Sequence, residues 1–357
     1  MGFFSLFSSY SKIKIPATFQ TIKENPERFF LFMAIVFIPL HFLIQIDRPI
    51  YGDSAVYANL GRYVAEGNFY PLRFRTFCEG IFADHPYLFF YFLGFFYKIF
   101  SFHEIAIKIP NLIFGLLTVF ILYRFLREES QYKGWLGALV AVFCIGFSPN
   151  YHVHVRDPLL DVSLVFFSVL SVYLFFQKRY YFLSGLSVAA AFLTKGTEGL
   201  PLLGAYALIF LWNLFRKKES ISKISIFMTG FLIPLLIFVL IDGYCNSFQW
   251  FISYYNGQFA GRFFSETNRT GGLLSTGFFI TFLRNYQPFL PFLLFFSYFY
   301  IRRKKYNDLF FFLWIWIFLI LLAFCIIKKD SSQHLMSIYS AGAILLGITA
   351  KDFFLQA

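Results

Sequence analysis

The sequence predicts an all-α polytopic membrane protein with about ten transmembrane helices. Hydrophobic residues make up 58% of the 357 residues and aromatic residues 24%, whereas only 14% are charged. A soluble domain is typically about 45–50% apolar and about 25% charged, and the mean hydropathy of +0.63 agrees with membrane insertion. This composition excludes two or three soluble domains. It also excludes a disordered chain, which would lack the apolar content.

Apolar segments long enough to cross a bilayer, about 20 residues each, recur along the chain. The first follows residues 1–29, which are too polar and too numerous for a signal peptide, so we expect a retained helix and a cytoplasmic N-terminus. The predicted spans are 30–46, 105–123, 134–149, 158–176, 180–194, 199–215, 222–241, 277–300, 308–327 and 333–350.

Segment 86–101 is apolar but short, and it carries Lys98. If it does not cross, the basic connectors between later spans fall on the cytoplasmic side, as the positive-inside rule favours. If it crossed, the cluster Arg302–Lys305 would lie outside. We therefore expect 86–101 to be a helix in the outer membrane interface. The net charge of +12 is then a topology signal and gives no support for a nucleic-acid partner.

This topology divides the chain into four parts. Residues 1–29 form the cytoplasmic N-terminus, and residues 30–241 form a core transmembrane module that includes a long outer loop at 47–104. A second outer loop covers 242–276, and 277–357 hold the C-terminal helices. The unusual polar residues lie in the outer segments, while the cytoplasmic connectors are short and basic. We therefore expect the chemistry on the outer face.

The first outer loop contains two candidate residues. Asp53 stands at the start of a short amphipathic pattern and is a candidate general base, although an aspartate there would also serve as a helix N-cap. His85, followed by Pro86, places an imidazole at the membrane surface. The alternative is a turn into the interfacial helix, since proline suits a first helical position.

The next outer turn brings five polar residues to the mouth of a span: His152, His154, Arg156, Asp157 and Asp161. An ionisable group inside a span is costly and is a functional candidate, which favours Asp161. Arg156 is a candidate phosphate ligand, but a structural ion pair with Asp157 or Asp161 is the alternative. His152 and His154 are weak candidates for a divalent metal site, which is the one cofactor the sequence suggests.

Three more cations lie in the later outer turns. Lys195 could contact a phosphate as a point charge or snorkel from a helix end. Lys328 lies outside against the topology rule, with His334 at the mouth of the last span, and an anionic headgroup would explain both. Cations suit a phosphate, carboxylates suit activation of a hydroxyl, and apolar spans suit a lipid tail. A lipid-phosphate sugar donor meets all three requirements.

Several motifs, in this order, resemble the membrane-embedded type C glycosyltransferase superfamily, in particular the protein O-mannosyltransferases and the lipid A aminoarabinose transferases. They are Tyr51-Gly52-Asp53-Ser54, Asp84-His85-Pro86, the helix entry Lys108-Ile-Pro-Asn, Arg156 with Asp161 five residues on, and Leu193-Thr194-Lys195-Gly196. The sequence departs from the family pattern at Ser54, where a second acid is usual, and at Tyr87, where a second proline is usual. These departures leave the branch and the acceptor open.

The resemblance implies an inverting glycosyltransferase that moves a hexose or pentose from a polyprenyl-phosphate donor to a hydroxyl or phosphate. The acceptor is a lipid, a glycan or a protein at the outer face of a bacterial inner membrane. Asp53 takes the role of base and Asp161 that of the second acid. Arg156, Lys195 and His85 take the place of the groups near the donor phosphate.

Two other functions are compatible with the sequence. A flippase or transporter of lipid-linked glycans would place ionisable groups near the bilayer midplane, whereas here they gather at one face. A glycan ligase or polymerase of another fold would place its catalytic groups in the late loop 242–276, for example at Arg262 and Arg269.

Overall fold

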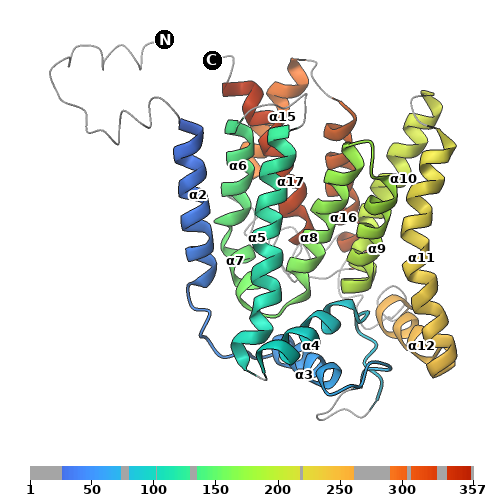
Figure 1. The fold of residues 1–357 in the computed structure, drawn as a ribbon. Helices are drawn as coiled ribbons and strands as arrows, with labels where there is room; N and C mark the ends of the chain where they lie inside the picture. The colour runs from blue at the N-terminus through green and yellow to red at the C-terminus, as the bar shows by residue number, and fades with distance from the viewer. Residues whose placement is uncertain are drawn as a thin grey trace.

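The computed structural model describes residues 26–73, 80–101, 103–128, 135–217, 220–260, 290–303, 307–327 and 336–354. In these residues the chain is helical apart from short connections, and the β pairing is limited to an isolated bridge between Arg73 and Ile81. The helices form one bundle with two shorter helices across one end (Figure 1). The predicted all-α class is confirmed.

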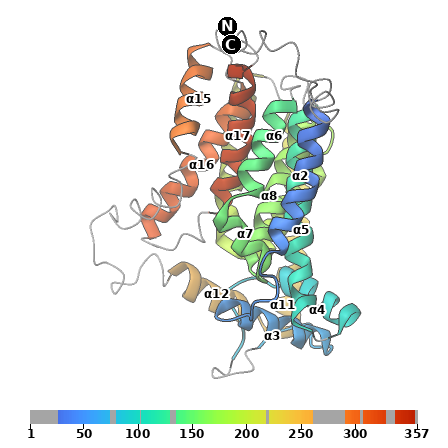
Figure 2. The ribbon, with the colours of Figure 1, turned by 90° about the vertical axis from the view of Figure 1, so that its left-hand side faces the viewer.

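The long helices of the bundle run side by side (Figures 1 and 2). Each predicted span overlaps one of them, although residues 134, 277–289 and 333–335 lie outside the described part. The helices are α2 (Pro26–Leu43), α5 (Glu104–Glu128), α6 (Trp135–Gly146), α8 (Leu160–Phe176), α9 (Tyr181–Lys195), α10 (Leu200–Phe215), α11 (Ile221–Asn246), α15 (Leu290–Arg302), α16 (Asp308–Ile327) and α17 (Met336–Phe354).

Fewer helices are long enough to cross a membrane alone than the ten predicted spans. Four described stretches are long and apolar enough to cross: Pro26–Leu43, Glu104–Glu128, Tyr181–Phe215 and Ile221–Asn246. The third of these comprises α9, α10 and the turn that joins them. A fifth is the pair α6 and α7 (Pro149–Arg156), which is bent by 62°. Other apolar helices, such as α8, are shorter. The prediction of ten transmembrane helices is therefore approximate.

Two short helices, α3 (Asp53–Ala65) and α4 (Leu88–Phe100), lie across the end of the bundle away from the start of α2 and the end of α17 (Figure 1). They pack through glycines. A Cβ added at Gly61 would lie 2.5 Å from the Cβ of Leu93, and one added at Gly94 would lie 2.5 Å from Cγ1 of Val64. Segment 86–101 thus forms a helix outside the bundle, as expected.

Helices α8 and α9 run antiparallel, and α10 then returns alongside α8. A buried hydroxyl cluster joins the three, because the Ser171 hydroxyl lies 3.0 Å from that of Ser184 and 2.9 Å from that of Tyr206. Helix α11 approaches α9 closely, since a Cβ added at Gly185 or Gly230 would fall 2.0 or 2.1 Å from a carbonyl oxygen of the other helix. Small residues allow such close helix packing in membranes.

The predicted outer loop 242–276 begins later than expected, because α11 continues to Asn246. The chain then turns through Ser247 and Phe248, both with positive φ, into α12 (Gln249–Tyr254) and the π-helical turn η3 (Tyr255–Ala260). Asp242 stabilises this corner: its carboxylate accepts hydrogen bonds from the Phe251 amide at 3.2 Å and the Tyr70 hydroxyl at 2.6 Å. Helix α12 lies at the same end as α3 and α4 (Figure 1).

Candidate active site

Asp161 is the centre of a buried polar cluster. It lies in the first turn of α8, and its side chain is 5% exposed. The Lys195 ammonium donates a hydrogen bond to Oδ1 at 2.5 Å. Nδ1 of His154, on α7, lies 3.1 Å from Oδ2. Contacts to both oxygens fix the orientation of the carboxylate.

Lys195 also contacts a second acid. Its Nζ lies 2.6 Å from Oε2 of Glu198, whose side chain is 7% exposed. Glu198 belongs to the 3-10 turn η2 (Gly196–Gly199), and Gly196 has a φ of +66°, which allows the chain to turn directly after α9. Two carboxylates therefore engage the ammonium that the sequence suggested for a phosphate. The sequence placed Glu198 beside Lys195 but gave it no role.

Arg156, the last residue of α7, is a buried cation with fewer partners. Its Nη1 donates a hydrogen bond to Oε1 of Gln45 at 2.9 Å, while Nη2 lies 3.8 Å from Oδ2 of Asp157. The residue is 5% exposed, and its Nε makes no hydrogen bond with the described residues. The sequence left a structural ion pair of Arg156 with Asp157 or Asp161 open. Arg156 contacts Asp157, whereas Asp161 contacts Lys195 and His154.

The beginning of α5 holds the segments that carry these residues. Lys108, which is 1% exposed, donates hydrogen bonds to the carbonyl oxygens of Ile46, at 2.7 Å, and Arg48. The Asn111 amide donates to the carbonyl oxygens of Asp157 and Leu159 at 2.6 and 2.7 Å, and lies 3.1 Å from that of His154. The sequence showed these residues only as part of a family motif. Their isolation within an apolar helix was the signal of a buried polar role.

Asp53 is exposed at the first position of α3. Gly52, with a φ of +61°, occupies the N-cap position, and the helix has no side-chain capping bond. Asp53 is therefore not the N-cap that the alternative interpretation required. Within the described residues its carboxylate forms no hydrogen bond or ion pair, so it is available to a ligand.

Tyr57 of α3 lies near several carboxylates of the candidate site. It is one helical turn beyond Asp53 on the same face of α3, it is 8% exposed, and its ring lies 6.0 Å from the His85 ring. Burial raises the pKa of its phenol well above the usual value, and nearby carboxylates raise it further. In order of effect these carboxylates belong to Asp53, Asp161, Glu198 and Asp84. The segments that carry these four acids therefore lie near enough to Tyr57 to act on its phenol.

Helix α12 and η3 also contact this site. The Trp250 indole donates to the Phe82 carbonyl at 3.1 Å, and the Thr197 amide donates to the Tyr254 hydroxyl at 2.9 Å. In η3, the Gln258 amide donates to Oδ1 of Asp84 at 3.0 Å. The contacts of α12 and η3 with the His85 segment and with η2 were not predicted from the sequence.

His152 does not join the cluster. Its Nε2 lies 3.3 Å from the Ile44 carbonyl oxygen, and its ring is 4.2 Å from that of His41 on α2. His152 and His154 therefore contact different elements. Among the described residues no group of three or more His, Cys, Asp or Glu is arranged to hold a metal ion. Lys328 and His334 lie outside the described residues and stay predictions, as do Arg262 and Arg269.

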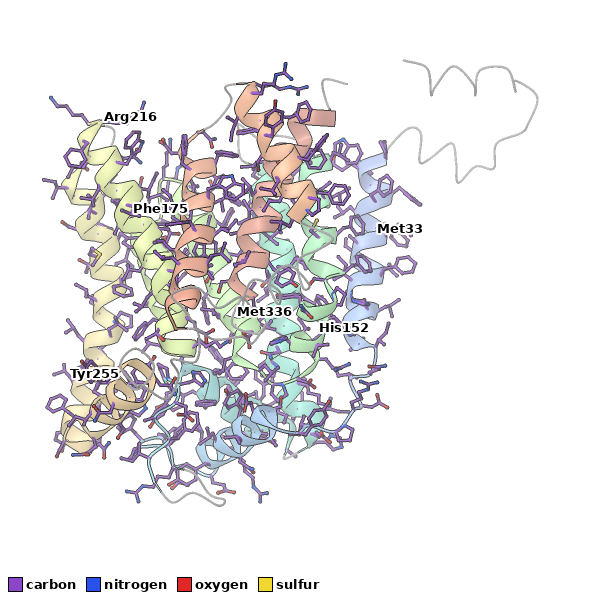
Figure 3. All side chains as sticks on the ribbon, turned by 180° about the vertical axis from the view of Figure 1, so that it is seen from behind. Met33, His152, Phe175, Arg216, Tyr255 and Met336 are labelled. Carbon is purple, nitrogen blue, oxygen red and sulfur yellow. The ribbon has the colours of Figure 1, made fainter. Side chains whose placement is uncertain are left out.

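An apolar cavity lies between α6, α15, α16 and α17. Its empty volume, counted together with the open space at its mouth, is about 610 Å³. Tyr339 lines it and accepts a hydrogen bond from the Asn150 amide of α7 at 3.0 Å. The cavity is thus joined to the helix that carries His154 and Arg156. Figure 3 shows His152 of α7 and Met336, which begins α17, at the same level of the bundle. The other lining residues are Cys144, Leu290, Leu293, Trp314, Ile317, Leu321, Ile338, Gly342, Ala343 and Leu346.

Comparison with known proteins agrees with this architecture. Residues 84–241 match the family model of dolichyl-phosphate-mannose-protein mannosyltransferase, a range that contains His85, Arg156, Asp161 and Lys195. No match was found among curated protein sequences.

Two solved structures of ArnT from Cupriavidus metallidurans are similar to the chain. The structure bound to undecaprenyl phosphate gives a TM-score of 0.69 at 16% identity, covering 89% of this chain and 59% of ArnT. The apo structure gives 0.63 at 17%, covering 90% and 58%. The chain thus spans less than two thirds of ArnT. The chain is an integral membrane protein with an ArnT-like fold, and its resemblance to the mannosyltransferases and aminoarabinose transferases is confirmed.

Proposed function

We propose that the chain is an inverting glycosyltransferase that moves a sugar from a polyprenyl-phosphate donor to an acceptor hydroxyl or phosphate. The observation that carries the proposal is the buried contact of Asp161 and Glu198 with Lys195, with the exposed Asp53 near enough to raise the pKa of the neighbouring Tyr57. These acids lie at the end of the bundle away from the start of α2 and the end of α17, which is the outer end in the predicted topology. The family match and the ArnT-like fold support a transferase that uses a lipid-linked sugar.

In the proposed reaction Asp53 is the general base. Its exposed carboxylate accepts the proton of the acceptor hydroxyl while that oxygen forms a bond to the anomeric carbon. The bond from the anomeric carbon to the donor phosphate breaks, and the phosphate leaves with the electron pair. Inversion follows because the new bond forms on the face opposite the leaving group.

The leaving phosphate requires positive charge, and Arg156 is the best-placed cation. Its guanidinium is buried and only partly paired, so a phosphate oxygen could complete its hydrogen bonds. Such a donor in a site that excludes water stabilises developing charge more than it would in water. His85 assists at the same site. Lys195 contributes mainly by holding Asp161, since two carboxylates already engage its ammonium.

The apolar cavity beside α7 is suited to the first isoprene units of the donor. Its walls are almost entirely apolar, and it is connected to α7 through Asn150 and Tyr339. The ArnT structure bound to undecaprenyl phosphate supports a lipid phosphate of this class.

The test is transfer from a panel of radiolabelled polyprenyl-phosphate sugars in membranes that contain wild type or Asp53→Asn. Asp47→Asn, an exposed aspartate in the same outer segment, is the matched control. Loss of transfer in Asp53→Asn alone, at equal expression, supports the proposal and identifies the sugar. Undiminished transfer would place the base elsewhere. No transfer by wild type from any donor would favour a flippase.

A further inference from the structure

Glu198 is the buried acid of the site that the proposed reaction does not use. It belongs to η2, between α9 and α10, and its side chain is 7% exposed. An acidic side chain is almost never buried without a partner. Here the contact is with Lys195, at 2.6 Å, so the two acids Asp161 and Glu198 share one ammonium.

The backbone of η2 is fixed from outside. A Cβ at Gly196 would lie 2.0 Å from the Tyr254 hydroxyl oxygen, and the Thr197 amide donates to that same hydroxyl at 2.9 Å. Tyr254 stacks on Trp250 at 4.8 Å, and Trp250 is 1% exposed. Helix α12 thus sets the conformation of the turn, and the turn presents Glu198 to Lys195.

The cluster therefore forms a chain of contacts from η2 to α7. Glu198 contacts Lys195, Lys195 contacts Oδ1 of Asp161, and Oδ2 of Asp161 faces His154. A lysine side chain has many rotamers and is entropically costly to fix. If Asp161 were its single acidic partner, the Lys195 ammonium could turn away and bind another anion, such as a phosphate. A second acid in contact with the same ammonium restrains it.

We propose that Glu198 is a positioning residue of this site, which keeps the Lys195 ammonium on Asp161 and away from the donor phosphate. The proposal rests on the proposed function and deepens it. It separates the two cations of the site: Lys195 orients an acid, and Arg156 receives the phosphate.

The experiment uses the full chain in detergent with Glu198→Gln, which removes the charge but keeps the shape. Glu198→Asp keeps the charge. Glu128→Gln is the matched control. Glu128 pairs with Arg124 at 2.8 Å on an exposed surface, at the C-terminal end of α5, whereas the beginning of α5 holds the site. Three quantities are measured: kcat and KM for the donor, binding of undecaprenyl phosphate, and thermal unfolding.

We expect Glu198→Gln to lower kcat at least tenfold, with less than about a twofold change in donor KM. Undecaprenyl phosphate should bind more tightly, by roughly threefold or more, because a negative charge near the phosphate is removed and Lys195 is released. Glu198→Asp should recover part of kcat, and Glu128→Gln should match wild type. In an Asp161→Asn background, Glu198→Gln should cause no further loss.

Other results would overturn the proposal. A kcat of Glu198→Gln equal to that of wild type would show that Glu198 does not position Lys195 for the reaction. Weaker lipid-phosphate binding, together with a lower unfolding temperature and a parallel loss of activity, would show that Glu198 only stabilises the fold. If wild type neither binds undecaprenyl phosphate nor transfers a sugar, the proposed function fails and this proposal fails with it. If Asp53→Asn loses transfer but Glu198→Gln is normal, only the role of Glu198 is wrong.

Discussion

Replacing Asn111 with alanine should destabilise the protein and inactivate the site together. The Asn111 amide is fully buried and binds the carbonyl oxygens of Asp157 and Leu159 at 2.6 and 2.7 Å. An amide nitrogen has two hydrogens, so two such bonds can be made at once. A hydrogen bond contributes about 0.5–1.5 kcal/mol net, and the loss of two gives about 1–3 kcal/mol. The carbonyl groups left behind lie between α7 and α8, where the chain between Arg156 and Asp161 turns.

The assay compares chemical unfolding in detergent and sugar transfer for wild type and Asn111→Ala. Asn213→Ala is the control. Asn213 is also buried, on α10, but its Oδ1 has no hydrogen-bond partner among the described residues, so its removal should cost less. We expect a transfer loss in Asn111→Ala that persists at temperatures where the variant is fully folded. A variant within about 0.5 kcal/mol of wild type that transfers normally would refute the view that Asn111 holds this junction.

The remaining predictions test packing, the cavity and the outer corner. Gly230→Ala should cost about 1–3 kcal/mol of overpacking, because the added Cβ would lie 2.1 Å from the Phe182 carbonyl oxygen; Gly342→Ala, which has open space, should unfold like wild type. Gly342→Leu should narrow the apolar cavity and raise the donor KM several-fold without loss of stability, and an unchanged KM would exclude the cavity as the tail site. Tyr70→Phe should destabilise the protein by about 1–3 kcal/mol, because it removes a 2.6 Å hydrogen bond to the buried Asp242 carboxylate; unfolding equal to that of wild type would show that water replaces this bond.

Hydropathy predicted the helices because each apolar run must bury its backbone in a helix to enter the bilayer. The distribution of positive charge in the later connectors, not hydropathy, placed 86–101 outside the bundle, where α4 is found. Hydropathy could not give the number of complete spans. The bend between α6 and α7 falls where Ser148 caps α7 and Pro149 begins it, a local signal that hydropathy alone does not register.

The candidate site was predictable only in part. Asp161 stood out as an acid inside an apolar run, and the structure brings it to Lys195 and near enough to Tyr57 to act on its phenol. Glu198 did not stand out, because an acid three residues from a lysine is equally typical of an exposed helix end. Its meaning depends on the burial that α8 and α12 impose, which is a property of the fold.

The Asp242 carboxylate gives the end of the bundle that carries α3, α4 and α12 a collective property. It binds the Tyr70 hydroxyl, the Phe251 amide and the Asn246 amide, so it joins the first outer loop, α12 and the end of α11. Neither loop can separate from α11 without breaking a bond to the same buried group. The two loops should therefore open as one cooperative unit. Amide hydrogen exchange would report this as a single opening free energy shared by both loops, independent of the bundle beneath them.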